Sequence, residues 1–209
     1  MNNTSFADEA IAYFTLAEKF LSLVQSSTHM IVTTKNSLWI TTTHDACTPE
    51  GEQEFRETYQ WTDTAISIPI LFNFYHGIEL LLKGYQQLLQ IIIKNNFTHH
   101  ISTLFTNIKE KLSDNHKIIQ LLTPYIHDIP QNSIIDKFLQ DNNSTIDKWY
   151  ELLKYPTNKK KNHNLFSHFE LKYGGNDALP FWKDIEYTAK ELIHTAVNDY
   201  NSYTIKDSS

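Results

Sequence analysis

The side chains best placed to do chemistry lie in the stretch YHGIELLLKGY, residues 75–85. His76, Glu79 and Lys83 are three and four positions apart, so a helix would line them up on one face. Together with His99 downstream, this row could form a catalytic set that acts on a substrate bound beside the helix. Whether it does so depends on whether the row faces water or is buried.

The same row also has a purely structural interpretation. On a solvent-exposed helix, Glu79 and Lys83 would form a pair worth about 0.2–0.5 kcal/mol. Apolar residues surround the row on most sides, however, and breaking a buried pair costs about 3–5 kcal/mol. We therefore expect a partly buried polar network that ties this helix to its neighbours.

The spacing of apolar residues predicts a fold made mostly of helices. Apolar residues recur three and four positions apart over residues 7–24, over 64–94 and from Pro180 onward, which predicts three long helices. Shorter helical segments are expected within 101–112, 116–126, 132–140 and 144–155. The segment 64–94 carries the polar row and should be the central helix of an all-α bundle.

One small β element is expected beside the helices. Within residues 28–44, the β-branched runs MIVTT and SLWITTT are separated by KNS, which predicts a β-hairpin. The stretch LFSHFELKY, residues 165–173, alternates well enough to add a strand to a small sheet. We interpret the chain as a single domain over residues 1–209, with an insertion at about 28–62.

Composition limits the class of protein. The 209 residues include 18 basic and 24 acidic side chains, and the net charge of -6 argues against a protein that mainly coats nucleic acid. Residues 65–93 are apolar but are interrupted by polar side chains, which makes this segment a poor membrane span. The N-terminus shows no signal-peptide pattern, so we expect a cytoplasmic protein. The preference for lysine, isoleucine and asparagine suggests an AT-rich bacterial genome.

Metal and cofactor sites are not predicted. Ten histidines are present, but no His-x-x-x-His pair falls on an expected helix. Cys47 is the only cysteine, so a disulfide and a cysteine-based zinc site are excluded within the chain. Its neighbours His44 and Asp45 make up part of a nucleophile set, but such partial sets are common by chance. A glycine-rich phosphate loop is lacking as well.

Three segments carry a family resemblance. LFNFYHGIELLLKGY, residues 71–85, resembles the second helix of HEPN domains, where the pattern His-Ala-Ile-Glu-Leu-x-Leu-Lys recurs. THHISTLF, residues 98–105, resembles the Gly-His-Asp-Leu-x-x-Leu segment that begins their next helix, with His99 in the His position. YELLKYP, residues 150–156, resembles an Arg-Tyr-Pro segment of many bacterial members. The three segments follow the family's order.

The resemblance implies a fold, an assembly and a set of partners. HEPN domains are antiparallel helical bundles, usually homodimers, and many are RNases of toxin–antitoxin and phage-defence systems. For this chain it implies an antiparallel all-α bundle, a homodimer, and RNA or a cognate protein as the partner. It also places His99 and Tyr155 near the polar row, where we expect them as its outside partners.

The catalytic signature of HEPN RNases is not found. That signature is an arginine followed, after four to six residues, by a histidine. Arg56 is the lone arginine and has no histidine at that spacing, and Lys154 stands where the Arg-Tyr-Pro segment has its arginine. Lysine cannot supply the planar fork of arginine to a phosphate. The resemblance therefore does not extend to the standard RNase site.

Lys159, Lys160 and Lys161 occupy the window where that histidine is expected. Three adjacent lysines could contact a phosphate backbone as point charges, although a solvated loop is the simpler alternative. Three hypotheses follow for the whole chain. It is a HEPN-like dimeric binding or regulatory protein without catalysis, or a divergent ribonuclease acting through the polar row and His99, or a structural partner-binding bundle.

Overall fold

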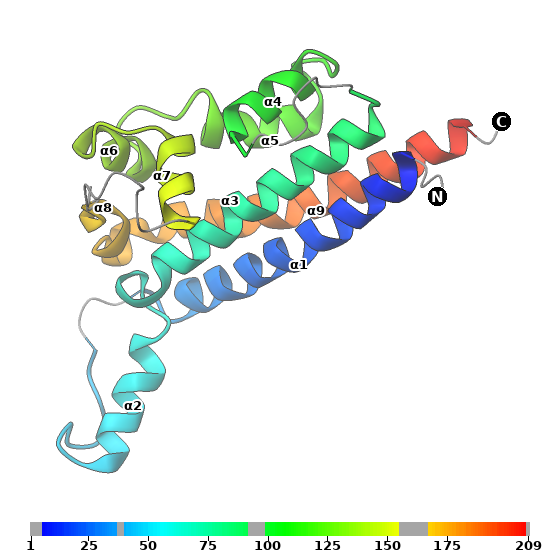
Figure 1. Ribbon diagram of the computed structural model, residues 1–209. Helices are drawn as coiled ribbons and strands as arrows, with labels where there is room; N and C mark the ends of the chain where they lie inside the picture. Colours follow the sequence, from blue (N-terminus) through cyan, green and yellow to red (C-terminus); the bar gives the residue numbers. More distant parts are fainter. Residues whose placement is uncertain (1–5, 37–39, 92–98, 155–166, 208–209) are drawn as a thin grey trace.

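The computed structural model describes residues 6–36, 40–91, 99–154 and 167–207. Every regular element in these ranges is a helix, so the prediction of an all-α fold is confirmed. The three long helices are α1 (Phe6–Thr33), α3 (Asp63–Leu88) and α9 (Leu179–Asp207). α1 runs antiparallel to α3 and α9, and the start of α1 lies at the same end of the bundle as the end of α9 (Figure 1).

α3 packs closely on α1 because glycines of α3 face large side chains of α1. A Cβ atom on Gly77 would lie 2.8 Å from the Leu21 side chain, and one on Gly84 would lie 2.5 Å from the Phe14 ring. Glycine allows the two backbones to approach at these points. Leu21 and Phe14 belong to the buried stripe of α1, which therefore fixes the stretch of α3 that carries the polar row.

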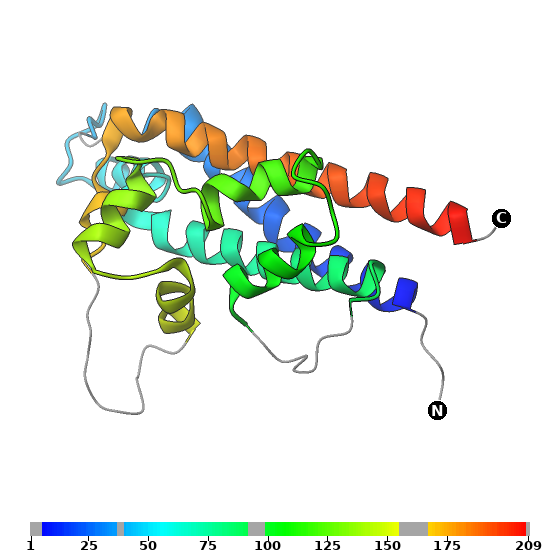
Figure 2. The ribbon, with the colours of Figure 1, turned by 90° about the horizontal axis from the view of Figure 1, so that it is seen from above.

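The shorter helices lie over α3 and α9, on the side away from α1 (Figures 1 and 2). They are α4 (Ile101–Lys109), α5 (Lys117–Ile126), α6 (Ile134–Asp141) and α7 (Ile146–Lys154), followed by α8 (Phe169–Lys172) and the 3₁₀ helix η1 (Gly175–Ala178). The buried Trp149 ring of α7 packs edge to face against Tyr75 of α3, with ring centroids 5.7 Å apart. This contact places α7 beside the polar row.

The β-hairpin predicted for residues 28–44 is wrong, because residues 28–33 continue α1. Thr28 and Ile31 extend the buried stripe of this helix and are both fully buried. The Thr28 hydroxyl also donates to the carbonyl oxygen of Val24 at 2.8 Å, a bond that a helix can supply. Burial against the neighbouring helices thus outweighs the β-propensity of the run.

The strand predicted for residues 165–173 is also wrong where the structure describes it. Residues 169–172 form α8, whose Leu171 side chain is buried. Residues 37–39 of the expected hairpin, and residues 165 and 166, lie outside the described residues. No strand occurs in the part of the chain that the structure describes.

α2 (Pro49–Tyr59) projects away from the bundle at the end opposite the start of α1 (Figure 1). The Thr48 side chain accepts a hydrogen bond from the Gly51 amide, and Pro49 occupies the first turn, where its missing N–H costs least. Among the described elements, α2 makes few contacts with other helices. The segment between α1 and α3 therefore contains this helix in place of a hairpin.

One helical stretch of the described chain, Pro49–Leu88, is long and apolar enough to cross a membrane by length and composition. Of its most apolar window, 61% is buried inside the structure. The apolar side chains of α3 include Leu71, Ile78 and Leu82, which are all part of the core. Burial in the bundle therefore accounts for the apolar character of this stretch.

Candidate functional site

The structure brings the predicted row of α3 together with side chains from α7 and from the start of α4. The Glu79 side chain lies at the centre and is 1% exposed. Its Oε1 atom accepts from Lys83 Nζ and from His99 Nδ1, both at 2.7 Å. Its Oε2 atom accepts from the Tyr150 hydroxyl and from Lys154 Nζ, both at 2.6 Å. A carboxylate has about four lone-pair positions, so these four donors satisfy it completely.

His76 joins this group through the Tyr150 hydroxyl, which lies 2.7 Å from its Nδ1 atom. Tyr150 has one hydroxyl hydrogen and gives it to Glu79, so it accepts the second bond from the Nδ1–H of His76. Phe20 meets the His76 ring edge to face at 4.5 Å, and Phe72 stacks on it at 5.8 Å. We call Glu79, its four donors and His76 the Glu79 cluster.

The Glu79 cluster holds its carboxylate in the ionised form. Burial alone would raise the pKa of Glu79, but the polar side chains around it, His76, Lys154, Lys83 and Tyr150, outweigh burial and hold this pKa well below its ordinary value. Burial and the hydrogen bond to Glu79 raise the pKa of the Tyr150 hydroxyl, so it stays protonated. Two lysines against one carboxylate leave the cluster with a net charge of +1 when its histidines are neutral.

The Glu79 cluster is most open to water at His99. The His99 side chain is 59% exposed, compared with 25% for His76 and 17% for Lys83. Both histidines use Nδ1–H inside the cluster, so each neutral ring carries its lone pair on Nε2. His99 thus combines a carboxylate partner with a basic nitrogen on an exposed ring, an arrangement that can accept a proton.

Tyr155, expected as an outside partner of the row, lies outside the described residues, and so do Lys159, Lys160 and Lys161. Two other residues of the YELLKYP motif, Tyr150 and Lys154, contact Glu79 instead. They are four positions apart and so share one face of α7. That spacing was visible in the sequence, but nothing in the sequence showed that this face meets α3.

A second buried polar group was not predicted from the sequence. Asp63, at the start of α3, is 1% exposed. Its Oδ2 atom accepts from Asn36 Nδ2 at 2.8 Å and from the amides of Gly174 and Gly175 at 3.0 and 3.2 Å. The Asp63 amide donates to Asn36 Oδ1 at 2.7 Å. Burial raises the pKa of Asp63, although these hydrogen bonds oppose the rise. We call this contact between three segments the Asn36–Asp63 clasp.

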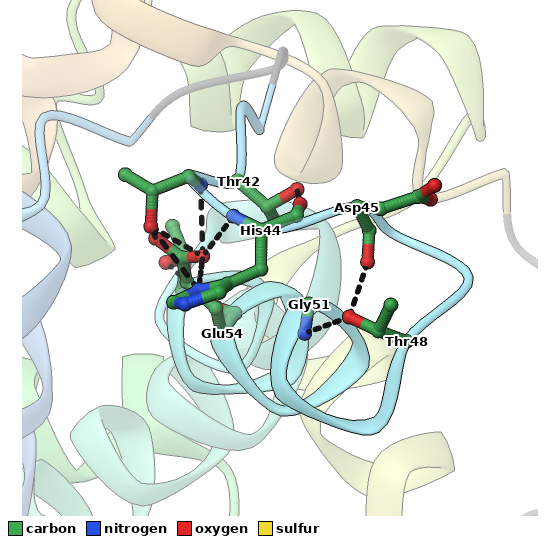
Figure 3. A network of polar contacts seen from close by, with 8 residues as sticks. Thr42, His44, Asp45, Thr48, Gly51 and Glu54 are labelled. Atoms are coloured by element: carbon green, nitrogen blue, oxygen red, sulfur yellow. Dashed lines mark hydrogen bonds and ion pairs between the residues drawn. The ribbon is translucent and has the colours of Figure 1, made fainter.

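Within the described ranges, no group of three His, Cys, Asp or Glu side chains could hold a metal ion. Cys47 is exposed. The ring of His44 lies over the carboxylate of Glu54, with Nδ1 3.5 Å from Oε2 (Figure 3). The histidine beside the cysteine is thus engaged with a glutamate of α2.

Comparison of the chain with protein-family models, with curated proteins and with solved structures gives no match. The HEPN resemblance therefore rests on the three sequence motifs. The structure shows where their polar residues lie: His76, Glu79 and Lys83 from the first motif, His99 from the second and Lys154 from the third all meet in the Glu79 cluster.

Proposed function

We propose that this chain is a HEPN-like binding protein without catalytic activity of its own. It would serve as a regulatory component of a phage-defence or toxin–antitoxin system in a bacterial cytoplasm, with a cognate protein or RNA as its partner. The family part of this proposal is supported by the three motifs in their order. The absence of catalysis is supported by the hydrogen bonding and the ionisation of the Glu79 carboxylate.

The absence of catalysis in this proposal is supported by the saturation of the Glu79 carboxylate with hydrogen bonds. Its four donors lie at 2.6–2.7 Å and leave no lone pair for a substrate. A pKa held well below the ordinary range means that this carboxyl carries no proton near neutral pH. A general acid or base works best when its pKa lies near the working pH. Glu79 therefore fits a structural role better than proton transfer.

A divergent ribonuclease is the second candidate, and His99 favours it. Its exposed ring is oriented by a carboxylate, and the net positive charge around it would attract a phosphate. In this alternative His99 acts on RNA, while Lys83 and Lys154 hold the backbone. The same contacts to Glu79 would then position catalytic groups.

An RNA-cleavage assay separates the two candidates. We expect purified protein to cleave labelled single-stranded RNA no faster than a mock preparation from cells that lack the gene. His99→Ala is the informative variant, because the His99 side chain is the most exposed member of the cluster. Cleavage by the wild type that disappears in folded His99→Ala protein would overturn the proposal and establish the ribonuclease.

A further inference from the structure

His99, just before α4, presents a nucleophilic nitrogen at the surface of the protein. Its Nδ1 atom lies 2.7 Å from Oε1 of Glu79, and an ionised carboxylate only accepts hydrogen bonds. Nδ1 therefore carries the hydrogen, and Nε2 of the neutral ring keeps its lone pair. The His99 side chain is 59% exposed. Because Nδ1 points to a buried partner, the opposite edge of the ring, with Nε2, is the outward one.

Three exposed histidines elsewhere in the described chain offer a comparison, because each also has a carboxylate beside Nδ1. The three pairs are His29–Glu186 at 3.0 Å, His127–Asp128 at 3.1 Å and His44–Glu54 at 3.5 Å (Figure 3). Their carboxylate side chains are 26–70% exposed, whereas that of Glu79 is 1% exposed. Water screens an exposed charge, so a buried carboxylate acts more strongly on the ring beside it.

The remaining donors fix the charge of Glu79 behind the His99 ring. Lys83 and Lys154 are 17% and 14% exposed, and each donates to this carboxylate. Since both ammonium groups are mostly buried and bonded within the cluster, they serve to keep Glu79 ionised. The Tyr150 hydroxyl holds the second oxygen at 2.6 Å. The ring of His99 thus has a negative charge of fixed position on its inner side and water on its outer side.

We propose that His99 is a phosphoryl-accepting residue, whose Nε2 atom takes a phosphoryl group while Glu79 holds the Nδ1 hydrogen. The Nε2 lone pair forms the new N–P bond. The bond from phosphorus to the donor's leaving group breaks, and its electron pair leaves with that group. The donor, a phosphoramidate or a phosphoanhydride, comes from outside the chain. No proton has to leave the ring, which becomes positively charged against the Glu79 carboxylate.

The arrangement suits a phosphoryl group better than an acyl group. Phosphoryl transfer asks mainly for positioning and for stabilisation of charge. Here the phosphoryl charge stays in water, and the positive ring faces the buried carboxylate. An acyl group would in addition need donors for its oxyanion, and the Ser102 amide at the start of α4 is already bonded to Asp147.

This inference goes beyond the proposed function, since it depends neither on RNA nor on the HEPN resemblance. A phosphoryl group adds charge and strong acceptor oxygens at the surface where it is attached. Attached to His99, it would give a binding protein a reversible input at the edge of the Glu79 cluster.

Potassium phosphoramidate, a small phosphoryl donor, tests the inference on the purified full chain. The initial rate is measured at each histidine at about pH 8, where an ordinary histidine is neutral. Mass spectrometry of peptides kept in alkali, in which phosphohistidine is stable, gives these rates. His99 should react at least about tenfold faster than His29, His44 and His127, because only its carboxylate acts from a buried, fixed position. ³¹P–¹H correlation spectra should place the group on Nε2.

Matched variants separate the effect of Glu79 from that of a carboxylate in water. Glu79→Gln keeps an acceptor for Nδ1 but removes the charge, and should bring the rate at His99 close to that at His29. Glu186→Gln, the same change at an exposed pair, should alter the rate at His29 by less than about twofold. His99→Ala should remove the fast reaction and leave the other histidines unchanged.

Equal rates at the four histidines of the wild type would overturn the inference, and this comparison requires no variant to fold. A phosphoryl group on Nδ1 of His99, or an unchanged rate at His99 in folded Glu79→Gln protein, would overturn it as well. The reaction contains no RNA. Its outcome is therefore separate from that of the RNA-cleavage assay, and the two proposals fail independently.

Discussion

Tyr150 of α7 donates its hydroxyl hydrogen to Glu79 of α3 at 2.6 Å, across 71 positions of the chain. The same hydroxyl accepts from His76, and Lys154 Nζ lies 4.1 Å from the centre of the Tyr150 ring. One side chain therefore docks α7 on α3, fixes the proton of a histidine and adds a cation–π contact. The stability of the α3–α7 junction should depend on it.

Tyr150→Phe should lower the free energy of unfolding by about 1–3 kcal/mol, because Glu79 and His76 each lose a buried hydrogen-bond partner. In addition, the Nδ1–H of His76 would no longer be held, and the ¹⁵N shifts of its ring should move towards the Nε2–H tautomer. Tyr187→Phe, which removes an exposed hydroxyl, is the control and should change neither quantity. A Tyr150→Phe variant as stable as the wild type would contradict this account.

The low pKa of Glu79 should make stability sensitive to acid. A group whose folded-state pKa is depressed contributes stability that is complete above its unfolded pKa, here near 4.5, and that is lost as the pH falls further. Glu79→Gln has no carboxyl to protonate. The difference in unfolding free energy between wild type and Glu79→Gln should therefore shrink from about pH 5 to about pH 3. Urea titrations across that range measure it, and a constant difference would argue against the ionised cluster.

The Asn36–Asp63 clasp should contribute more to the free energy of unfolding than the backbone conformation of Asn36 does alone. Asn36 is buried and has φ 47°, while Asn132 is exposed and has φ 61°. Replacing either by Ala places a Cβ-bearing residue without a local hydrogen bond in the left-handed region, at about 1 kcal/mol. Asn36→Ala also leaves Asp63 with fewer donors, so it should cost about 2 kcal/mol more than Asn132→Ala. Equal denaturant midpoints for the two variants would show that the clasp adds nothing.

Much of the helical framework could be predicted from the sequence, because its signal is local. Apolar residues at three-and-four spacing located α1, α3 and α9, although the central helix ends at Leu88 rather than near residue 94. Gln90 there has φ 52°, which ends the helix. The start of α2 also had a local signal that went unused: Thr48 and Pro49 followed by acidic residues are typical of a helix N-terminus.

What the sequence could not supply is which surfaces meet. The β-branched run at the end of α1 predicted a hairpin. The reason it stays helical is the burial of Thr28 and Ile31, which only the structure shows. Likewise, the spacing of His76, Glu79 and Lys83 indicated one face of a helix but not the residues opposite. Tyr150 and Lys154 reach Glu79 through the docking of α7, a tertiary contact that no local pattern encodes.

Glu79→Ala tests the central claim, that the polar row is a closed, buried cluster. Its removal would leave Lys83 and Lys154 without their carboxylate, and should lower the free energy of unfolding by about 2 kcal/mol or more. Glu52→Ala is the matched control: Glu52 pairs with Arg56 at the same four-residue spacing, but on an exposed helix. It should cost less than about 0.5 kcal/mol.

The most direct measurement is therefore the urea midpoint of Glu79→Ala beside those of Glu52→Ala and the wild type, at neutral pH. The account predicts a clear loss for Glu79→Ala and almost none for Glu52→Ala. A Glu79→Ala midpoint that matches the control would contradict it, because the row would then face water with its histidines free to act on a bound molecule.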